Sequence, residues 1–157
     1  MSQALFNAIA FQDLIKLEEC LESGASPSLP NEEGLSPLAL VASMIKKSFE
    51  DGAYKEEEMY KKMAAMLIVH GASGEDLHHE CGETSNLCRQ ICRYVIELSL
   101  NRQDSAKVAE LINANRLWFE EDNPELEEAF INAIEKGDKK RVETMFEKCQ
   151  VHYAYEQ

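Results

Sequence analysis

The residues best suited to chemistry lie near the middle of the chain. Imidazole and thiolate groups bind zinc, and five residues that carry them are His78, His79, Cys81, Cys88 and Cys92. Cys88 and Cys92 are one helical turn apart and share a helix face. The group lacks the close Cys-x-x-Cys pair of most zinc sites, so we interpret its thiols as core residues and its histidines as surface residues. A metal-binding helical protein is the alternative.

Patterns of enzyme active sites are missing from the sequence. It has no Gly-rich phosphate loop, no His-Glu-x-x-His and no Gly-x-Ser-x-Gly. Cys81 next to two histidines lacks an identifiable third group that would orient an activated thiol. The carboxylates are too numerous for one pair to stand out as acid and base. We therefore predict no enzymatic activity, no cofactor and no bound metal.

Charge and length narrow the classes of partner. The chain has 157 residues, and Asp plus Glu (29) outnumber Lys plus Arg (16), which gives a formal charge of −13. Nucleic acid and anionic membrane would be repelled, so we expect neither as a partner. The longest apolar run, 63–69, is far shorter than a membrane span. Five cysteines, an odd number, are typical of reduced thiols and a cytoplasmic protein.

The elements that organise the chain are paired helices. Gly34 tolerates the positive φ of a tight turn, Ser36 can cap a helix, and Pro37 fits its first position. Asp13 can cap another helix. Apolar spacing predicts helices over 4–11, 14–21, 37–47 and 60–70. We expect a shared core of eight residues, namely Leu5, Ile9, Leu17, Leu21, Leu38, Val41, Leu67 and Ile68.

Short glycine motifs end two of these helices. They read Gly24-Ala25-Ser26 and Gly71-Ala72-Ser73, and Pro27 and Pro30 disfavour helix in the link that follows the first. The order of helix, Gly-Ala exit, extended link, Gly turn and Ser-Pro cap resembles the ankyrin repeat, which is a β-turn plus two antiparallel helices. Gln12 stands where that pattern has a glycine between its helices. The resemblance implies an all-α solenoid of about four antiparallel helix pairs.

The repeat pattern divides a single domain, 1–157, into four parts. These are 2–33, 34–73, a degenerate part 74–122, and a C-terminal cap 123–152. Leu5 and Gly24 are 19 positions apart, whereas Leu38 and Gly71 are 33 apart, so the second part has a 14-residue insertion. The inserted segment, within 47–60, is either a longer loop or two helix extensions that meet at Gly52.

Further helices are predicted beyond residue 74. Leu87, Ile91, Tyr94, Val95 and Leu98 share one side of a helix, and a second runs through 104–112. Asn-Pro at 123–124 starts another helix, which ends at Gly-Asp at 137–138. Segment 130–138 repeats segment 5–13 at an offset of 125, so the two ends of the chain resemble one unit.

The resemblance also implies a function. Ankyrin arrays bind proteins through the fingers and first helices that line their concave face, so we expect a protein-binding module without enzymatic activity. The matching positions here are Phe11, Gln12, Asn31, Glu32, Glu33, Leu35, Ser43 and Met44. Trp118 is interpreted as a core residue between helix pairs, with an exposed anchor for a partner as the alternative.

The charge of the chain suggests what such a partner presents. The net charge of −13, with a run of six carboxylates at 120–128, favours a partner with a basic surface. The run is interpreted first as a solvated helix start. A bacterial effector or regulatory subunit that inhibits one enzyme by occlusion is a further alternative, and an effector would act in the host cytosol.

Overall fold

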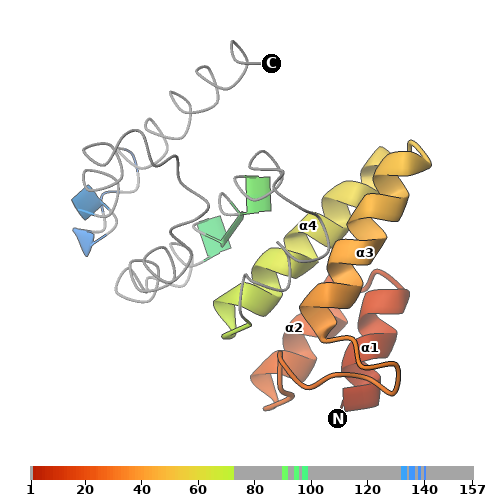
Figure 1. The fold of residues 1–157 in the computed structure, drawn as a ribbon. Coiled ribbons are helices and arrows are strands. Elements are labelled where there is room, and N and C mark those ends of the chain that lie inside the picture. Colours follow the sequence, from red (N-terminus) through yellow and green to blue (C-terminus); the bar gives the residue numbers. More distant parts are fainter. Residues whose placement is uncertain are drawn as a thin grey trace. The chain divides into compact units, whose positions relative to one another are not determined.

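The computed structural model describes residues 2–72 together with residues 90, 91, 94, 95, 97, 98, 132, 133, 135, 136, 138 and 140. Contacts along the chain define two compact units, Met1–Thr84 and Ser85–Gln157. The first unit contains α1 (Ser2–Ala10), α2 (Leu14–Glu22), α3 (Pro37–Glu50) and α4 (Tyr54–Val69), as Figure 1 shows. Every element in the described residues is helical, which confirms the all-α prediction for this part of the chain.

The four helices form two stacked pairs. Within the pairs α1 packs against α2 and α3 against α4, and between the pairs α1 lies on α3 and α2 on α4 (Figure 1). One pair of helices cannot bury its apolar side alone, so stacking is what gives the unit a continuous core.

The predicted core is confirmed in this unit. Its eight residues are all buried. Leu21 is 5% exposed, and the other seven are exposed by 1% or less, namely Leu5, Ile9, Leu17, Leu38, Val41, Leu67 and Ile68. All seven residues from Met63 to Val69 are buried, so this half of α4 has no face in contact with solvent. A helix that is apolar on every side is typical of the interior of a fold.

The predicted helix starts are also confirmed. The Asp13 carboxylate accepts the backbone N–H of Lys16 at 3.0 Å, and the Ser36 hydroxyl accepts that of Ala39 at 3.1 Å. Pro37 occupies the first turn of α3, where no intrahelical partner exists for an N–H. Each cap satisfies a donor that the helix itself leaves without a partner.

All four helices of this unit end in one motif. After α2, the N–H of Ala25 donates to Cys20 O at 3.0 Å and that of Gly24 to Leu21 O at 3.2 Å. This is a Schellman motif, in which the residue after the helix takes a positive φ. The residues in that position are Gln12 (φ 56), Gly24 (φ 101), Gly52 (φ 70) and Gly71 (φ 109). Gln12 therefore adopts the left-handed backbone conformation that glycine adopts at the ends of the other three described helices.

The insertion lengthens both helices of the second pair. α3 continues to Glu50 instead of ending near Lys47, and α4 begins at Tyr54 instead of Tyr60. The predicted boundaries were wrong there, and of the two alternatives the helix extensions that meet at Gly52 are correct. The second pair has 14 and 16 residues in its helices, against nine in each helix of the first.

The second unit contains a hydrogen bond that the repeat at an offset of 125 predicts. The N–H of Asp13 donates to Ala8 O at 2.9 Å, and the N–H of Asp138 donates to Ala133 O at 2.9 Å. Both alanines are 3% exposed. The same backbone contact and the same burial therefore recur at equivalent positions of the two units.

A second bond at the same offset supports this equivalence. The N–H of Phe11 donates to Asn7 O at 3.0 Å, and that of Lys136 to Asn132 O at 3.1 Å. Both asparagines are exposed. The described residues of 132–138 thus repeat two backbone hydrogen bonds of the end of α1.

The helix predicted around 87–98 is partly described. Six of its residues are helical, and Ile91 (0%) and Val95 (1%) are buried on the predicted apolar side. Of the helix predicted from 123–124 to 137, residues 132, 133 and 135 are described and are helical. The helix predicted over 104–112 and the acidic run at 120–128 lie outside the described residues.

Candidate protein-binding surface

The finger, residues 31–35, is a turn held together by Asn31. The Asn31 Oδ1 atom accepts the N–H groups of Glu33 and Leu35, each at 3.0 Å. The backbone closes the turn as well, because Asn31 N–H donates to Leu35 O at 2.8 Å and Gly34 N–H to Asn31 O at 3.0 Å. Gly34 has φ 83, as predicted for a turn glycine. Asn31 is half-buried, and its side chain therefore shapes the finger from within.

Two carboxylates are what the finger presents to solvent. Glu32 and Glu33 are exposed, and neither makes an ion pair with another residue of the described part. Leu35, at the base of the finger, is half-buried. A rigid turn presents these charges without a large ordering cost on binding.

The first helix pair and its finger are strongly acidic. Residues 2–36 contain six carboxylates and one lysine, Lys16. Lys16 Nζ lies 3.7 Å from Glu19 Oε2, and both side chains are more than half exposed, so this pair stabilises the fold very little. Residues 2–36 therefore carry an excess of five negative charges.

The side chain of Gln12 makes a hydrogen bond inside the fold. Its side-chain Nε2 donates to the Tyr60 hydroxyl at 3.3 Å, across 48 positions of sequence. Tyr60 is 1% exposed, so the bond gives a buried hydroxyl a partner. It also fixes the turn between α1 and α2 beside α4. The amide of Gln12 is therefore used inside the fold.

The remaining predicted contact residues lie along α3 and at the end of α1. Ser43 and Met44 are half-buried in α3, and the Ser43 hydroxyl donates to Leu40 O at 3.1 Å. Phe11 is 81% exposed, the largest value among the exposed large apolar residues of the described part. Phe11 and Met44 are 33 positions apart, as are Leu5 and Leu38.

The predicted contact residues therefore do not all lie together, because the finger and Met44 are at different levels of α3. The finger lies at the N-terminal end of α3, and Met44 lies eight residues after Ser36, about 12 Å along the helix. Phe11, Glu32 and Glu33 are exposed, whereas Gln12, Asn31 and Ser43 make internal hydrogen bonds. Trp118 lies outside the described residues.

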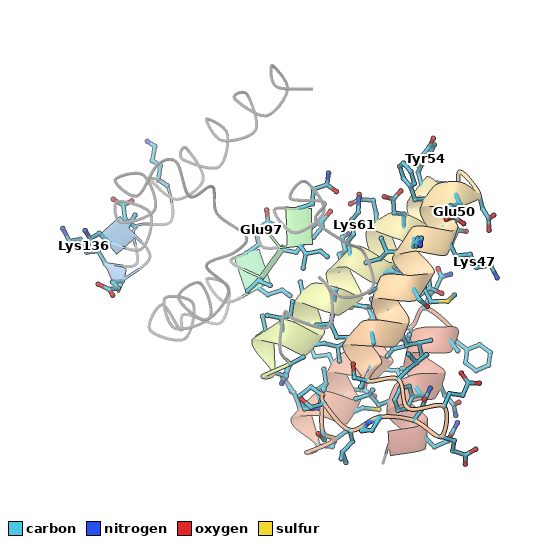
Figure 2. All side chains as sticks on the ribbon, viewed as in Figure 1. Lys47, Glu50, Tyr54, Lys61, Glu97 and Lys136 are labelled. Atoms are coloured by element: carbon cyan, nitrogen blue, oxygen red, sulfur yellow. The ribbon has the colours of Figure 1, made fainter. Side chains whose placement is uncertain are left out.

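Exposed aromatics on the second pair were missed by the sequence analysis. Phe49 is 66% exposed and Tyr54 is 68% exposed, on either side of the turn at Gly52. Figure 2 shows Tyr54 at the free end of the hairpin, with Lys47 and Glu50 on the neighbouring end of α3. The available signal was that residues 48–59 contain two aromatics and no second glycine or proline that would indicate a long loop.

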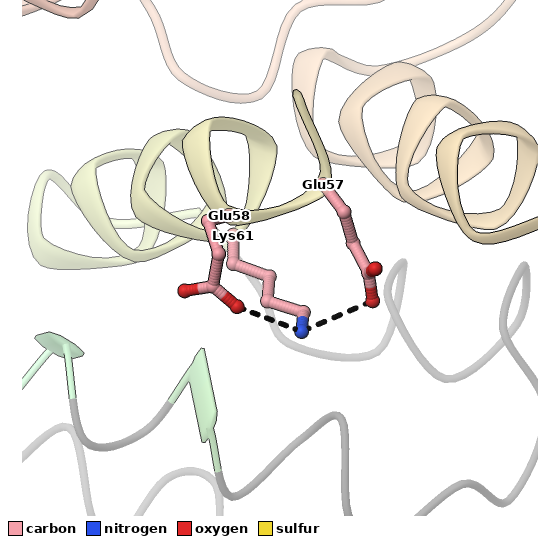
Figure 3. A network of polar contacts seen from close by, with 3 residues as sticks. All are labelled: Glu57, Glu58 and Lys61. Carbon is pink, nitrogen blue, oxygen red and sulfur yellow. Dashed lines mark hydrogen bonds and ion pairs between the residues drawn. The ribbon is translucent and has the colours of Figure 1, made fainter. Parts of the chain in front are cut away.

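A buried lysine on α4 is fully compensated by carboxylates. Lys61 Nζ lies 3.1 Å from Glu57 Oε1 and 3.2 Å from Glu58 Oε1 (Figure 3). The side chains of Lys61 and Glu57 are 7% and 12% exposed. A buried charge needs such partners. The two carboxylates neutralise the Lys61 ammonium group and leave one negative charge in excess, and we assign no acid–base chemistry to the cluster.

The structure does not describe the residues of the predicted zinc alternative. His78, His79, Cys81, Cys88 and Cys92 all lie outside them, and within them no group of three or more His, Cys, Asp or Glu side chains could hold a metal ion. Cys20 is a free, half-buried thiol on α2, as expected of a structural cysteine. Within residues 2–72 and the shorter described stretches, no helix has the length and apolar character to cross a membrane.

Comparisons of the chain with protein-family models, with curated proteins and with solved structures gave no match.

Proposed function

We propose that this chain is a short ankyrin-like array that binds another protein through its finger and first-helix face, without enzymatic activity. The support comes from local geometry. Pairs stack first helix on first helix and second on second. Each helix of the described pairs ends in the same glycine-type motif.

The observation that carries the binding proposal is the construction of the finger. Asn31 fixes the turn with two side-chain hydrogen bonds, while Glu32 and Glu33 stay exposed and unpaired among the described residues. A turn that serves only as a connection has no need of two adjacent, preorganised charges. Such a feature is what a binding loop on a rigid scaffold requires.

The proposed partner has a basic surface. Complementary charge mainly accelerates association, and it is screened over about 8 Å at physiological salt. Apolar contacts at Phe11 and Met44 would act mainly on dissociation. The carboxylate run at 120–128 is a second source of negative charge.

The test is charge reversal of the finger in the full chain. A partner is first captured from lysate with the unchanged protein, and its kinetics are then measured with E32K/E33K. We expect association to slow about tenfold and to lose much of its salt dependence. The control is E19K/E22K, which makes the same charge change at two exposed positions of α2. Equal association rates for all three proteins would remove the finger from the binding surface.

Occlusion of a single enzyme, as by a regulatory subunit or effector, would use the same surface, and only the identity of the captured partner separates it from a general scaffold. The metal-binding alternative predicts one equivalent of zinc, lost when Cys88 and Cys92 are changed to serine.

A further inference from the structure

One apolar stripe of α3 is buried along most of its length and then becomes exposed. Leu38, Ala42, Ile45 and Phe49 are spaced by four, three and four residues, so they share one helix face. Leu38 and Ala42 are 0% exposed and Ile45 is 2% exposed, whereas Phe49 is 66% exposed. The stripe therefore continues past whatever covers its first three members.

The length of the first helix pair explains this change. α3 packs against α4 and α1. α4 runs alongside α3 to the common turn at Gly52, but α1 ends at Ala10 (Figure 1). Phe49 lies in the last turn of α3, and we attribute its exposure to the shorter helices of the first pair.

The height of the resulting step follows from one hydrogen bond. The bond from Gln12 to the Tyr60 hydroxyl places the α1–α2 turn at the level of Tyr60. Tyr54, at the end of the hairpin, is six residues earlier in α4, which corresponds to about 9 Å at 1.5 Å per residue. The second pair therefore projects about 9 Å beyond the first.

We propose that this step, formed by the α1–α2 turn with Phe11 and by the uncovered face of α3 with Lys46 and Phe49, binds an amphipathic α-helix of a partner protein. The proposal rests on the protein-binding function proposed above and adds a second contact surface to it. Helices pack with their axes 8–10 Å apart, so a helix that lies on the turn and against α3 matches the height of the step.

The chemistry of the bound helix follows from the surface that it would extend. α3 packs against α1 as well as against α4, and the buried residues of α1 are Leu5, Phe6, Ala8 and Ile9. A partner helix that continues this interface presents apolar side chains at spacings of three and four. Lys46, one turn before Phe49, is exposed and makes no ion pair with another described residue. It favours an acidic residue beside those anchors.

The first experiment replaces Phe49 with a photo-reactive benzoyl-phenylalanine in the full chain. Ile15, which is 73% exposed on α2, is replaced in the same way as the matched control. We expect position 49, and not position 15, to cross-link to a segment of another protein with apolar residues at helical spacing. Cross-links from position 49 to nothing, to a second copy of this chain, or to a segment without apolar anchors would overturn the proposal.

The second experiment measures the affinity of the cross-linked partner for F49A, I15A and E32K/E33K. We expect F49A to weaken binding about thirtyfold, the change that corresponds to about 2 kcal/mol for an aromatic anchor. I15A should change it less than twofold. Loss with the finger variant but not with F49A would refute the step and keep the proposed function. Failure to capture any protein partner, with unchanged protein or with either photo-reactive variant, would refute both.

Discussion

The helices of the two pairs in the first unit end in the same motif, but the pairs differ in helix length and in charge. Both second helices end in Gly-Ala, and the first helices of both pairs end in the same motif with positive φ. The first pair with its finger, residues 2–36, has six carboxylates and one lysine, whereas residues 37–72 have five of each. The comparison shows that the two pairs share the motif that ends their helices, while helix length and surface charge differ between them.

The largest expected effect is a difference in stability loss between a buried and an exposed position on one apolar stripe of α3. Leu38→Ala removes a fully buried side chain and should reduce the free energy of unfolding by about 2–5 kcal/mol. Phe49→Ala, on the same face but mostly exposed, should cost less than about 1 kcal/mol. Denaturant unfolding of both variants measures the difference. Similar losses would show that α1 does not limit the covered part of α3.

A smaller effect separates the two kinds of residue at the helix ends. Gly24→Ala should cost about 1–2 kcal/mol, because a Cβ there meets no atom within 4 Å and only the backbone conformation at φ 101 is strained. At Gln12, glycine relieves that strain but loses the bond to Tyr60, whereas alanine loses the bond and keeps the strain. Gln12→Gly should therefore be more stable than Gln12→Ala by about 1 kcal/mol in thermal or denaturant unfolding. The reverse order would contradict the assignment of Gln12 to the glycine position.

The smallest expected effect concerns the capping side chains of α2 and α3, Asp13 and Ser36. Asp13→Ala and Ser36→Ala each remove one capping bond, and each should cost about 1 kcal/mol. Asn is the matched control at both positions, because it can also cap a helix. If alanine and asparagine gave equal stability, capping by these side chains would not contribute to the fold.

Much of the first unit could be predicted because its signals are local. Asp13, Ser36 and Pro37 act within one helical turn, and the Gly-Ala exits act within six residues. The apolar periodicity identified the buried residues for the same reason. These features could be predicted because the interactions that produce them are short-range in sequence.

The rest depends on contacts between distant residues. The exposure of Phe49 depends on where α1 ends in space, and the bond from Gln12 to Tyr60 spans 48 positions. For the candidate surface, the positions were read from the repeat pattern, but the internal use of Asn31 and Ser43 was not. The 14-residue insertion left two readings open, since Gly52 fits a loop and a turn between helices equally well.

The stacking of the two pairs is the claim on which both proposed surfaces depend, and one nuclear Overhauser measurement tests it most directly. The account predicts cross-peaks between the side-chain amide protons of Gln12 and the ring protons of Tyr60, because their polar atoms are 3.3 Å apart. Contacts between Asp13 and Lys16 in the same spectra serve as the local control. If the local contacts are present and the Gln12–Tyr60 cross-peaks are absent, the first pair does not lie against α4 as described.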